Sequence, residues 1–368
     1  MKILLVQLIG RGGIQLYTSQ LAESLSKSEN EVTVLLGDYL FDENHYSNSK
    51  IKIARISMQP SYFGMILKII NPSTYYCILK IIYHEKPDVI HILFEDILSS
   101  MVSLFLKMKR YKLVLTVHNP TPHIGDNFIL KVNSQFSRFI MKNIVSAVIV
   151  HGSKLKSILV NNGFIKNKVF VIPHGDYSYF TKWKKETKTI GKTILFFGLI
   201  RDYKGLEYLI KAEPLIKYSI PDVKIIIAGD GNFEKYKGSI INLNNYEIYN
   251  RFILDEEVAE LFQRSSIVVL PYTNGSQSGI IPIAYAFKKP VIVTNVGSIP
   301  DVVENNVTGY VVPPRDSEAL ANAIIKLLKD DKLRENMGEN AYRKMKADLS
   351  WDAVAEKTIE VYKKVIEG

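Results

Sequence analysis

The sequence contains one cysteine, Cys77, in 368 residues. No disulfide framework can form, and a zinc site built on several cysteines is excluded. This cysteine usage fits a reducing cytoplasm. No apolar run approaches the roughly 20 residues of a membrane-spanning helix. Internal repeats, low-complexity segments and carboxylate or histidine clusters with metal-ligand spacing are also absent, so no metal site is predicted.

The N-terminal run MKILLVQLIG is too short for the apolar part of a signal peptide and lacks a cleavage site. It ends at a glycine loop and predicts a first buried strand. Apolar residues make up 47% of the chain and charged residues 23%, as in a soluble globular protein.

Positive charge is concentrated in the first half of the chain. The whole chain has a net charge of +10, and residues 51–180, with 16 basic and 6 acidic side chains, account for +10 by themselves. Such a field favours an anionic partner, namely a membrane surface or a nucleic acid. The alternative is a solvated basic surface without a partner.

Apolar strand candidates alternate with helical patterns along most of the chain, which predicts an α/β fold with parallel sheets. The alternation lapses after residue 175 and resumes near residue 191. We therefore expect an N-terminal domain at 1–175, a linker at 176–190 and a C-terminal domain at 191–351. The last helix, at about 352–368, is expected to pack back on the first domain.

Residues 270–293, LPYTNGSQSGIIPIAYAFKKPVIV, form the most informative stretch. An apolar strand is followed by a small polar loop and then by the start of a helix. Free backbone N–H groups and the helix dipole make such a turn suitable for a phosphate or diphosphate. The alternative is an ordinary strand-to-helix turn that binds nothing.

Several motifs in order resemble a known family. They are KPDVIHIL, LVLTVHN, VFVIPHGDYSYF, ILFFGLIRDYKGLEYLIKA, IIIAGDG and the long block from SIVVLPYTNGSQSG to NVTGYVVPPRD. Together they resemble the retaining glycosyltransferases of family 4, which have the GT-B fold of two Rossmann-like domains facing a cleft. The resemblance covers nearly the whole chain.

This resemblance implies a hexosyltransferase-like enzyme of class EC 2.4. The donor would be a nucleotide-diphosphate sugar with UDP or GDP, and the acceptor a glycan or a lipid-linked molecule. Neither a metal nor another cofactor is implied, because basic side chains and helix N-termini would stabilise the leaving diphosphate. Two alternatives stay open: a non-catalytic GT-B scaffold subunit, and a GT-B sugar-nucleotide epimerase or synthase.

The family's functional residues map onto named positions here. Catalytic roles are implied for His118 beside the donor sugar, and for Arg201 and Lys204 on the phosphates. The arginine lies two residues later than usual, because Leu199 occupies the usual position. The implied donor-binding residues are Gly12, Gly13, Arg251, Phe252, Ile253, Asn274, Ser276, Gln277, Ser278, Gly279 and Ile280.

Some of these roles have competing explanations. Gly10–Gly13 does not meet the dehydrogenase fingerprint G-x-G-x-x-G. His174, in the IPHG motif, is better explained as a hinge residue that packs a turn. Arg201 could form a salt bridge, and Phe252 could simply pack.

The main departure is the E-x7-E pair of the family. No acidic residue occurs between Glu260 and Asp301, and the two glutamate positions fall on Gly275 and Ile283. A branch of the family shows a similar SQSG loop. In it, Asn274, Ser276 or Gln277 would replace the carboxylates as neutral hydrogen-bonding groups.

Segments 62–86 and 101–112 mix lysine and arginine with aromatic and aliphatic residues. Such a face can lie in the headgroup layer of an anionic membrane. We therefore expect a cytoplasmic protein that associates peripherally with the inner face of the membrane. Core-facing helices with snorkelling lysines are the alternative. No nucleic-acid-binding motif accompanies the charge, so no nucleic acid is expected as a partner.

Overall fold

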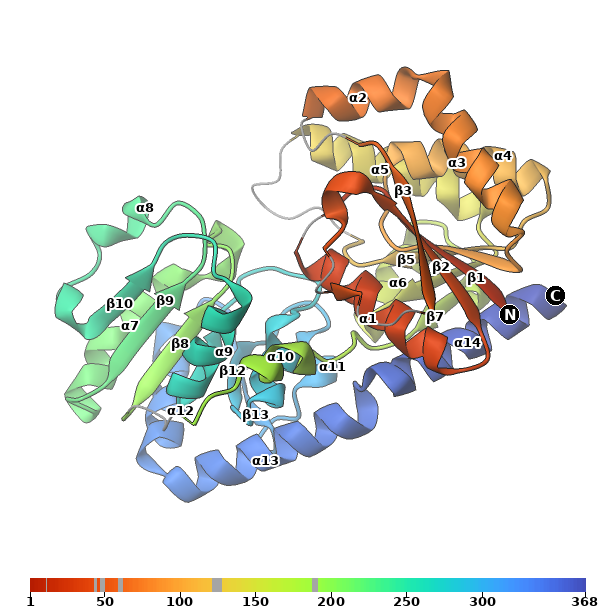
Figure 1. Cartoon of the computed structure of the whole chain (residues 1–368). Helices are drawn as coiled ribbons and strands as arrows, with labels where there is room; N and C mark the ends of the chain where they lie inside the picture. The colour runs from red at the N-terminus through yellow and green to blue at the C-terminus, as the bar shows by residue number, and fades with distance from the viewer. Residues whose placement is uncertain (11, 43–44, 47–49, 59–61, 121–127, 187–190) are drawn as a thin grey trace. The chain divides into compact units, whose positions relative to one another are not determined.

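The computed structural model describes residues 1–368 except 11, 43–44, 47–49, 59–61, 121–127 and 187–190. The described chain divides into two compact units (Figure 1). Among the described residues, unit 1 comprises 1–120, 128–175 and Trp351–Gly368, and unit 2 comprises Asp176–Ser350. Within the expected linker, Ser178–Trp183 forms the short 3-10 helix η4, and 187–190 lie outside the described residues.

Unit 1 is built on a parallel sheet with the order β3-β2-β1-β4-β5-β6-β7. Its strands are β1 Lys2–Gln7, β2 Glu31–Gly37, β3 Ile51–Ile56, β4 Val89–Ile92, β5 Leu113–Val117, β6 Ala147–Val150 and β7 Val169–Val171. Its helices are α1 Gly13–Lys27, α2 Tyr62–Ile70, α3 Pro72–Glu85, α4 Ile97–Met108, α5 Phe128–Ile144, α6 Ser153–Asn161 and α14 Trp351–Glu367, with 3-10 turns η1 Asp38–Leu40 and η3 Lys166–Lys168.

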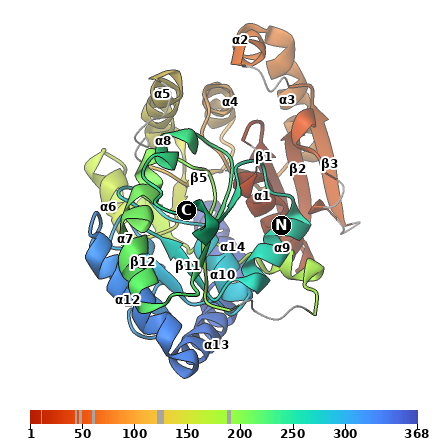
Figure 2. The same ribbon diagram turned by 90° about the vertical axis from the view of Figure 1, so that its left-hand side faces the viewer.

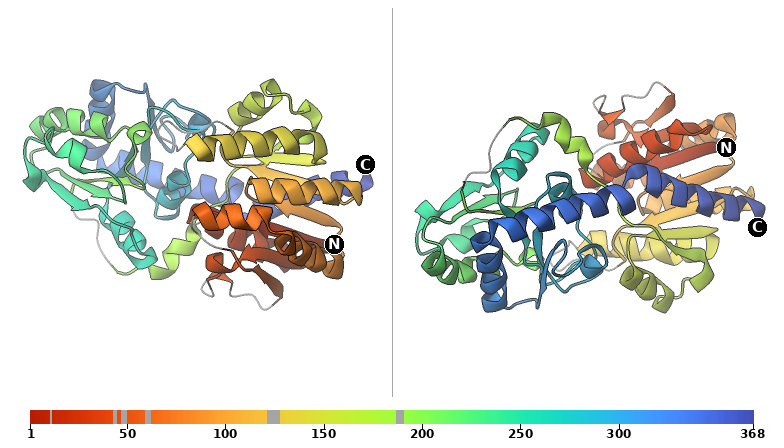
Figure 3. Two further views of the ribbon diagram at one scale, coloured as in Figure 1. Left: turned by 90° about the horizontal axis from the view of Figure 1, so that it is seen from above. Right: turned by 90° about the horizontal axis from the view of Figure 1, so that it is seen from below.

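Both faces of this sheet are buried, because successive side chains of a strand point to opposite faces. In β1, Leu4 and Val6 belong to the core under α3, α4, α5 and α6. Ile3 and Leu5 belong to the core under α1 and α14. Figure 3 shows the red helix α1 beside the blue helix α14 in its right-hand view. The near-continuous apolar runs in the sequence follow from this double burial.

Unit 2 contains a second parallel sheet, with the order β10-β9-β8-β11-β12-β13. Its strands are β8 Thr193–Phe197, β9 Lys224–Ala228, β10 Tyr246–Tyr249, β11 Ile267–Leu270, β12 Val291–Thr294 and β13 Gly309–Val312. The helical elements are η5 Asp202–Lys204, α7 Leu206–Ser219, α8 Glu234–Lys237, η6 Leu243–Asn245, α9 Asp255–Arg264, α10 Ile280–Ala286, α11 Ile299–Val302, α12 Ser317–Lys329 and α13 Asp331–Asp348. Figure 2 turns this unit toward the viewer, with α7 next to α12.

The parallel strands place the predicted site residues of each unit at one edge of its sheet. All strand pairs are parallel, so the carboxyl ends of the strands in each unit meet at one edge, where ligands bind in such folds. The glycine loop follows β1 and His118 follows β5 in unit 1. In unit 2, Arg201 and Lys204 follow β8, Arg251 follows β10 and Ser278 follows β11.

The basic and aromatic region 62–85 forms α2 and α3, with Asn71 capping α3 through its side chain. Within the described residues, no helix is both long and apolar enough to span a bilayer.

Candidate functional site

Lys204 and Ser278 meet through a buried tyrosine in unit 2. The ammonium of Lys204 donates to the hydroxyl of Tyr272 at 2.6 Å. That hydroxyl lies 3.1 Å from the Oγ atom of Ser278, and Ser278 Oγ accepts the backbone N–H of Ile280 at 3.3 Å. Two residues predicted on separate loops therefore belong to one hydrogen-bonded chain.

The environment of Lys204 is aromatic and weakly solvated. Its Nζ lies 4.0 Å from the centroid of the Tyr272 ring and 5.4 Å from that of Tyr203. Desolvation lowers the pKa of Lys204 to about 8, with Tyr203 acting in the opposite sense. Burial also raises the pKa of Tyr272, so its hydroxyl stays protonated. A cation that is poorly hydrated before a ligand arrives loses little further hydration when it binds an anion.

The loops after β8 and β11 approach closely enough to form this chain. A Cβ atom at Gly205 would lie 1.9 Å from the carbonyl oxygen of Pro271, and Gly205 has φ +68°. The backbone N–H of Thr273 donates to the carbonyl of Tyr203 at 2.8 Å. Glycine is required at 205 because any side chain would push the two loops apart.

The other predicted phosphate-binding residues, Arg201 and Gly279, are not part of this hydrogen-bonded chain. Arg201 is exposed and precedes η5, and its carbonyl accepts the N–H of Lys204 at 2.9 Å. Neither a salt bridge nor a side-chain hydrogen bond of Arg201 occurs within the described residues. Gly279 has ordinary helical φ, and a Cβ there would meet the Tyr177 ring at 2.9 Å. Packing against Tyr177 is therefore one physical reason for glycine at 279, beside the predicted approach of a phosphate.

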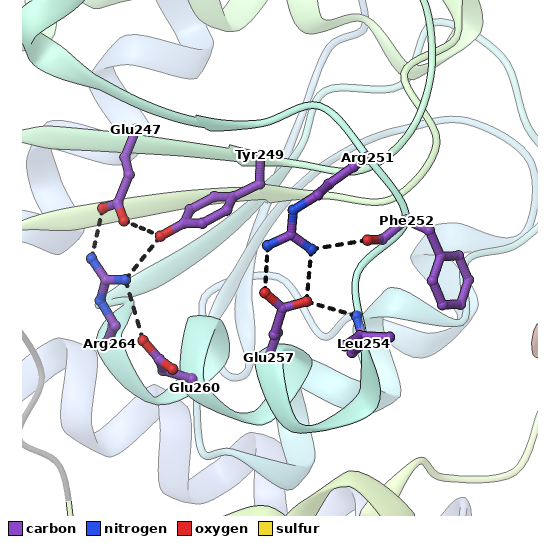
Figure 4. Close-up of polar contacts among 8 residues, drawn as sticks. All are labelled: Glu247, Tyr249, Arg251, Phe252, Leu254, Glu257, Glu260 and Arg264. Atoms are coloured by element: carbon purple, nitrogen blue, oxygen red, sulfur yellow. Dashed lines mark hydrogen bonds and ion pairs between the residues drawn. The ribbon is translucent and has the colours of Figure 1, made fainter.

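The loop after β10 is held by two carboxylate–guanidinium networks (Figure 4). Arg251 donates to both oxygens of Glu257, at 2.5 and 2.7 Å, and to the carbonyl of Phe252 at 3.0 Å. Glu257 also accepts the N–H of Leu254, which caps α9. The Arg251 side chain thus fixes the loop.

A second arginine supports the strand beside that loop. Arg264 contacts Glu247 at 2.6 Å, Glu260 at 3.6 Å and the Tyr249 hydroxyl at 3.3 Å, and Tyr249 in turn donates to Glu247.

The remaining predicted base-binding residues differ in exposure. Phe252 is 72% exposed, so simple core packing does not explain it, whereas Ile253 is buried.

The positions expected for the two glutamates hold no polar side chain. Ile283 is buried in α10. The carbonyl of Gly275 would lie 2.0 Å from a Cβ at Gly297, which has φ +55°. Of the three predicted substitutes, Asn274 is exposed, Gln277 is half-buried and Ser276 is buried.

In unit 1, Gly12 and Gly13 begin α1 directly after the β1 loop. Both are exposed, Gly12 has φ +69°, and a Cβ at Gly12 would meet nothing within 4 Å. The glycine at 12 therefore meets a requirement of backbone conformation, because an L-residue is strained at that φ.

His118 lies in a row of hydrogen bonds across the carboxyl ends of four strands. Its Nε2 donates to the carbonyl of Leu93 after β4 at 3.0 Å. Its Nδ1 lies 3.1 Å from Nε2 of His151 after β6, and His151 Nδ1 donates to the carbonyl of Ile172 after β7 at 3.0 Å. The ring of Tyr17 packs edge-on against His118 at 5.0 Å. His118 is buried, and both its nitrogens have partners inside unit 1.

The hydrogen bonds of this row need more protons than two neutral histidine rings hold. Carbonyl oxygens only accept hydrogen bonds, so both outer ring nitrogens must carry protons. The contact between the rings then needs a third proton, whereas two neutral imidazoles hold two. Burial and the neighbouring imidazole of His174 lower the pKa of His118 to about 3. The pair is therefore neutral at pH 7, and one of its three polar contacts lacks a proton.

The turn that carries His118 is also held from α5. Arg138 donates to the carbonyl of Asn119 at 2.8 Å and pairs with Glu95 at 3.1 Å, and both charged side chains are buried. Burial raises the pKa of Glu95, and the guanidinium opposes that rise. The Oε2 atom of Glu95 has no hydrogen-bond partner among the described residues.

His174 packs against Tyr17 at 5.1 Å and Trp351 at 6.3 Å between ring centroids. A Cβ at Gly175 would lie 2.4 Å from the Trp351 ring. These contacts agree with a structural role for the IPHG motif at the start of α14.

Two residues near the site escaped the sequence reasoning. Tyr272 was given no role, although it directly precedes the polar loop. His151 follows β6 in IVHG as His118 follows β5 in TVHN. Because neighbouring parallel strands end at the same edge, this repeated strand-plus-histidine pattern could have predicted their contact.

Within the described residues, no group of three or more histidine, cysteine, aspartate or glutamate side chains is arranged to hold a metal ion. Metal independence stays a prediction.

Two family models match the chain. Residues 11–175 match the model described as Glycosyltransferase Family 4, and residues 180–344 match Glycosyl transferases group 1. Together they cover every strand of both sheets except β1, and the chain belongs to the family 4 glycosyltransferases with the GT-B fold. It is a glycosyltransferase.

Relatives of known sequence agree with this assignment. A phosphatidyl-myo-inositol mannosyltransferase of Mycolicibacterium smegmatis is 25% identical over 369 residues, covering 96% of this chain and 90% of that protein. An uncharacterized glycosyltransferase of Methanocaldococcus jannaschii is 25% identical over 381 residues, covering 97% and 95%.

Solved structures share the fold. Sucrose-phosphate synthase from Thermosynechococcus elongatus has a TM-score of 0.79 at 19% identity, over 100% of this chain and 99% of that one. Anabaena HepE in complex with UDP has a TM-score of 0.76 at 18% identity, over 99% and 100%. HepE has also been solved with UDP-glucose.

Proposed function

We propose that the protein transfers a hexosyl group, with retention and without a metal, from a nucleotide-diphosphate sugar to a glycan or lipid-linked acceptor. The observation that carries this proposal is the chain from Lys204 through Tyr272 to Ser278. It brings a cation next to a hydroxyl and a polar loop, which are groups that bind a diphosphate.

The chemistry assigns a role to each group. Negative charge builds on the leaving diphosphate as the bond to the anomeric carbon breaks. Lys204 and Arg201 would stabilise that charge, with the backbone around Ser278 and Gly279 adding N–H donors. α10 has only seven residues, so the side-chain cations would supply most of the stabilisation. His118 would lie beside the donor sugar.

Donor recognition would rest on neutral groups. HepE binds UDP and UDP-glucose, which supports a UDP-sugar, and a GDP-sugar is the other donor considered. Arg251, Phe252 and Ile253 would border the base, while Gly12 and Gly13 would face the phosphates and sugar. Asn274, Ser276 and Gln277, the last through its half-buried amide, would replace the family's carboxylates.

The acceptor side is assigned to unit 1. The mannosyltransferase of M. smegmatis is named for a lipid, phosphatidyl-myo-inositol. Residues 51–180 carry +10 here, and large apolar side chains are exposed among the lysines of α3, α4 and α5. These are Tyr76, Tyr83, Phe105, Met108 and Phe139. A basic surface with exposed aromatic side chains supports peripheral binding to the cytoplasmic face of an anionic membrane.

A donor screen by thermal shift tests the function. A bound ligand raises the melting temperature through its affinity for the native state. We expect one nucleoside diphosphate and its sugar to stabilise the wild type, and Lys204→Ala to lose that shift. Lys211→Ala, an exposed lysine on α7 of the same unit, is the matched control. Absence of a shift with every UDP and GDP compound would contradict the proposal.

Vesicle co-sedimentation tests the membrane part separately. Binding to anionic vesicles should fall as salt rises, because surface charges are screened over about 10 Å at 0.1 M salt. Phe105→Ser and Met108→Ser should weaken it. Equal sedimentation with neutral and anionic vesicles would remove this part and leave the donor assignment intact.

A further inference from the structure

Unit 1 contains a cavity of about 630 Å³ at the opposite edge of its sheet from His118. Its walls come from the end of α4, from the residues just before β5, β6 and β7, and from the end of α14. The lining residues are Lys107, Arg110, Tyr111, Lys112, Ser146, Asn167, Lys168, Phe170, Lys364, Val365 and Gly368. This volume lies within the usual range of small-molecule sites.

Five of the lining side chains are cationic, and no aspartate or glutamate side chain lines the cavity. They belong to Lys107, Arg110, Lys112, Lys168 and Lys364. In the described part of the chain, none of the five forms an ion pair with a carboxylate. Elsewhere in the described part of the chain some lysines do have such partners: Lys27 pairs with Asp352 and Lys288 pairs with Glu339.

Helix dipoles do not balance this charge. Both α4 and α14 end at the cavity with a lysine in the last turn. A helix C-terminus carries roughly half a negative charge, so the two ends offset about one of the five positive charges. The carboxyl group of Gly368, the last residue of the sequence, also lies in the lining and offsets about one more. The remaining cations repel one another unless an anion lies between them.

The cavity is distinct from the predicted donor and acceptor edge. Lys112 directly precedes β5, and His118 directly follows it. Five residues at roughly 3.3 Å each place the two edges about 16 Å apart. A ligand in this cavity therefore does not overlap the edge where parallel sheets bind their substrates.

Arg110 occupies a position that favours glycine. Its φ is +61°. Its N–H donates to the carbonyl of Lys107, and the N–H of Tyr111 donates to that of Leu106, both at 3.0 Å. This is a Schellman ending, in which the left-handed residue is usually glycine. An arginine there costs conformational free energy and keeps a guanidinium at the cavity.

We propose that this cavity binds a phosphate-bearing ligand. The phosphate would lie among the lysines and Arg110, whose planar guanidinium suits two-point contact with phosphate oxygens. The half-buried rings of Tyr111 and Phe170 would pack against the rest of the ligand. The same chemistry is offered by a soluble phosphate ester and by the headgroup of phosphatidate. The proposal is independent of the glycosyltransferase site.

The test compares two double variants of the full chain. Lys112→Ala with Lys168→Ala removes two cavity cations, and Lys154→Ala with Lys156→Ala removes the same charge from α6. Inorganic pyrophosphate is titrated by calorimetry with the nucleotide site saturated by UDP or GDP. Vesicles of phosphatidylcholine with and without phosphatidate form the second arm.

The cavity variant should bind at least about 10-fold more weakly than the control in one arm. Loss in the pyrophosphate arm supports a soluble ligand, and loss only with phosphatidate supports the lipid. Equal behaviour of the two variants in both arms overturns the proposal.

Arg110→Gly separates binding from folding. Glycine relieves the left-handed strain, so the urea midpoint should rise. Affinity should fall in the same arm that the double variant identifies. A variant that binds as tightly as wild type would overturn the role of Arg110.

Discussion

At the scale of residues, the candidate donor site depends on Tyr272. Its hydroxyl is the only described group that contacts both the Lys204 ammonium and the Ser278 hydroxyl. The side chain is 1% exposed, and its carbonyl accepts from Thr294 Oγ1 at 2.6 Å. With both ends held, Tyr272 fixes where the lysine points before any ligand binds, which lowers the entropy lost on binding.

Tyr272→Phe should therefore weaken binding of the nucleoside diphosphate by about 10-fold, because a hydrogen bond to a charged group is worth about 1.5–3 kcal/mol. The ring remains, so the cation–π contact is kept. Calorimetric titration measures the change. Tyr285→Phe removes an equally buried hydroxyl, bonded to Thr308 at 2.7 Å, and should leave affinity unchanged. Equal affinities for both variants would exclude Tyr272 from the site.

The ionisation of Lys204 gives a pH dependence. Its pKa is lowered to about 8, and an anion binds the charged form. Affinity for the nucleoside diphosphate should be complete near pH 7 and fall by up to about 10-fold by pH 9. Lys204→Arg stays charged and should remove this dependence. A wild-type affinity that is constant from pH 7 to 9 would contradict the assignment.

At the scale of elements, two loops of unit 2 are shaped by glycines at close approaches. Gly205 brings the β8 loop onto Pro271, and Gly297 brings the loop after β12 onto Gly275. The second contact fixes the polar loop at the position where the family usually has its first glutamate. Ser298 N–H donates to the Ser276 carbonyl at 2.8 Å in the same region.

Gly297→Ala should destabilise unit 2 by about 3 kcal/mol, since it combines a left-handed φ with a clash against backbone. Donor binding should weaken with it, because the polar loop must move. Urea unfolding gives the stability change. Gly238→Ala is the control, because its Cβ meets nothing within 4 Å. Similar stabilities of the two variants would show that the β12 loop does not hold the polar loop.

At the scale of the whole molecule, buried histidines are concentrated in unit 1. Desolvation lowers the pKa of His91 and His118 to about 3 and that of His174 to about 4. It also lowers the pKa of His151 well below its ordinary value.

The sign of the acid effect follows from these shifts. The rings stay neutral in the native state, whereas the unfolded chain binds protons below pH 6.5. Each ring therefore removes about 1.4 kcal/mol of stability per pH unit below 6.5. Burial raises the pKa of Glu95 and Asp96, which acts in the opposite sense and offsets part of that loss.

Unit 1 should consequently open before unit 2 on acidification. Amide hydrogen exchange at pH 7.5 and 5, corrected for intrinsic rates, measures each unit separately. Exchange in β4, β5 and β6 should accelerate more than in β8 and β11. His174→Phe should reduce the difference, and His84→Gln, at an exposed ring, should not. Equal acceleration in both units would contradict this prediction.

Much of the fold was predictable because its signals are local. Apolar runs such as those of β4, β5 and β11 read directly as strands buried on both faces. Lys204 and Ser278 are recognisable in the loops after β8 and β11. The short elements α8 and α11 escaped prediction, because four residues carry no usable periodicity.

The sequence alone therefore determined the two parallel sheets, the order of their loops and the edge at which each predicted side chain lies. Only the tertiary structure decided which of those side chains meet. Tyr272 contacts Lys204 across 68 positions of the chain, His151 contacts His118 across 33, and the cavity is lined by cations from Lys107 to Lys364. Such contacts depend on how loops from separate strands converge, and local propensity does not encode that geometry.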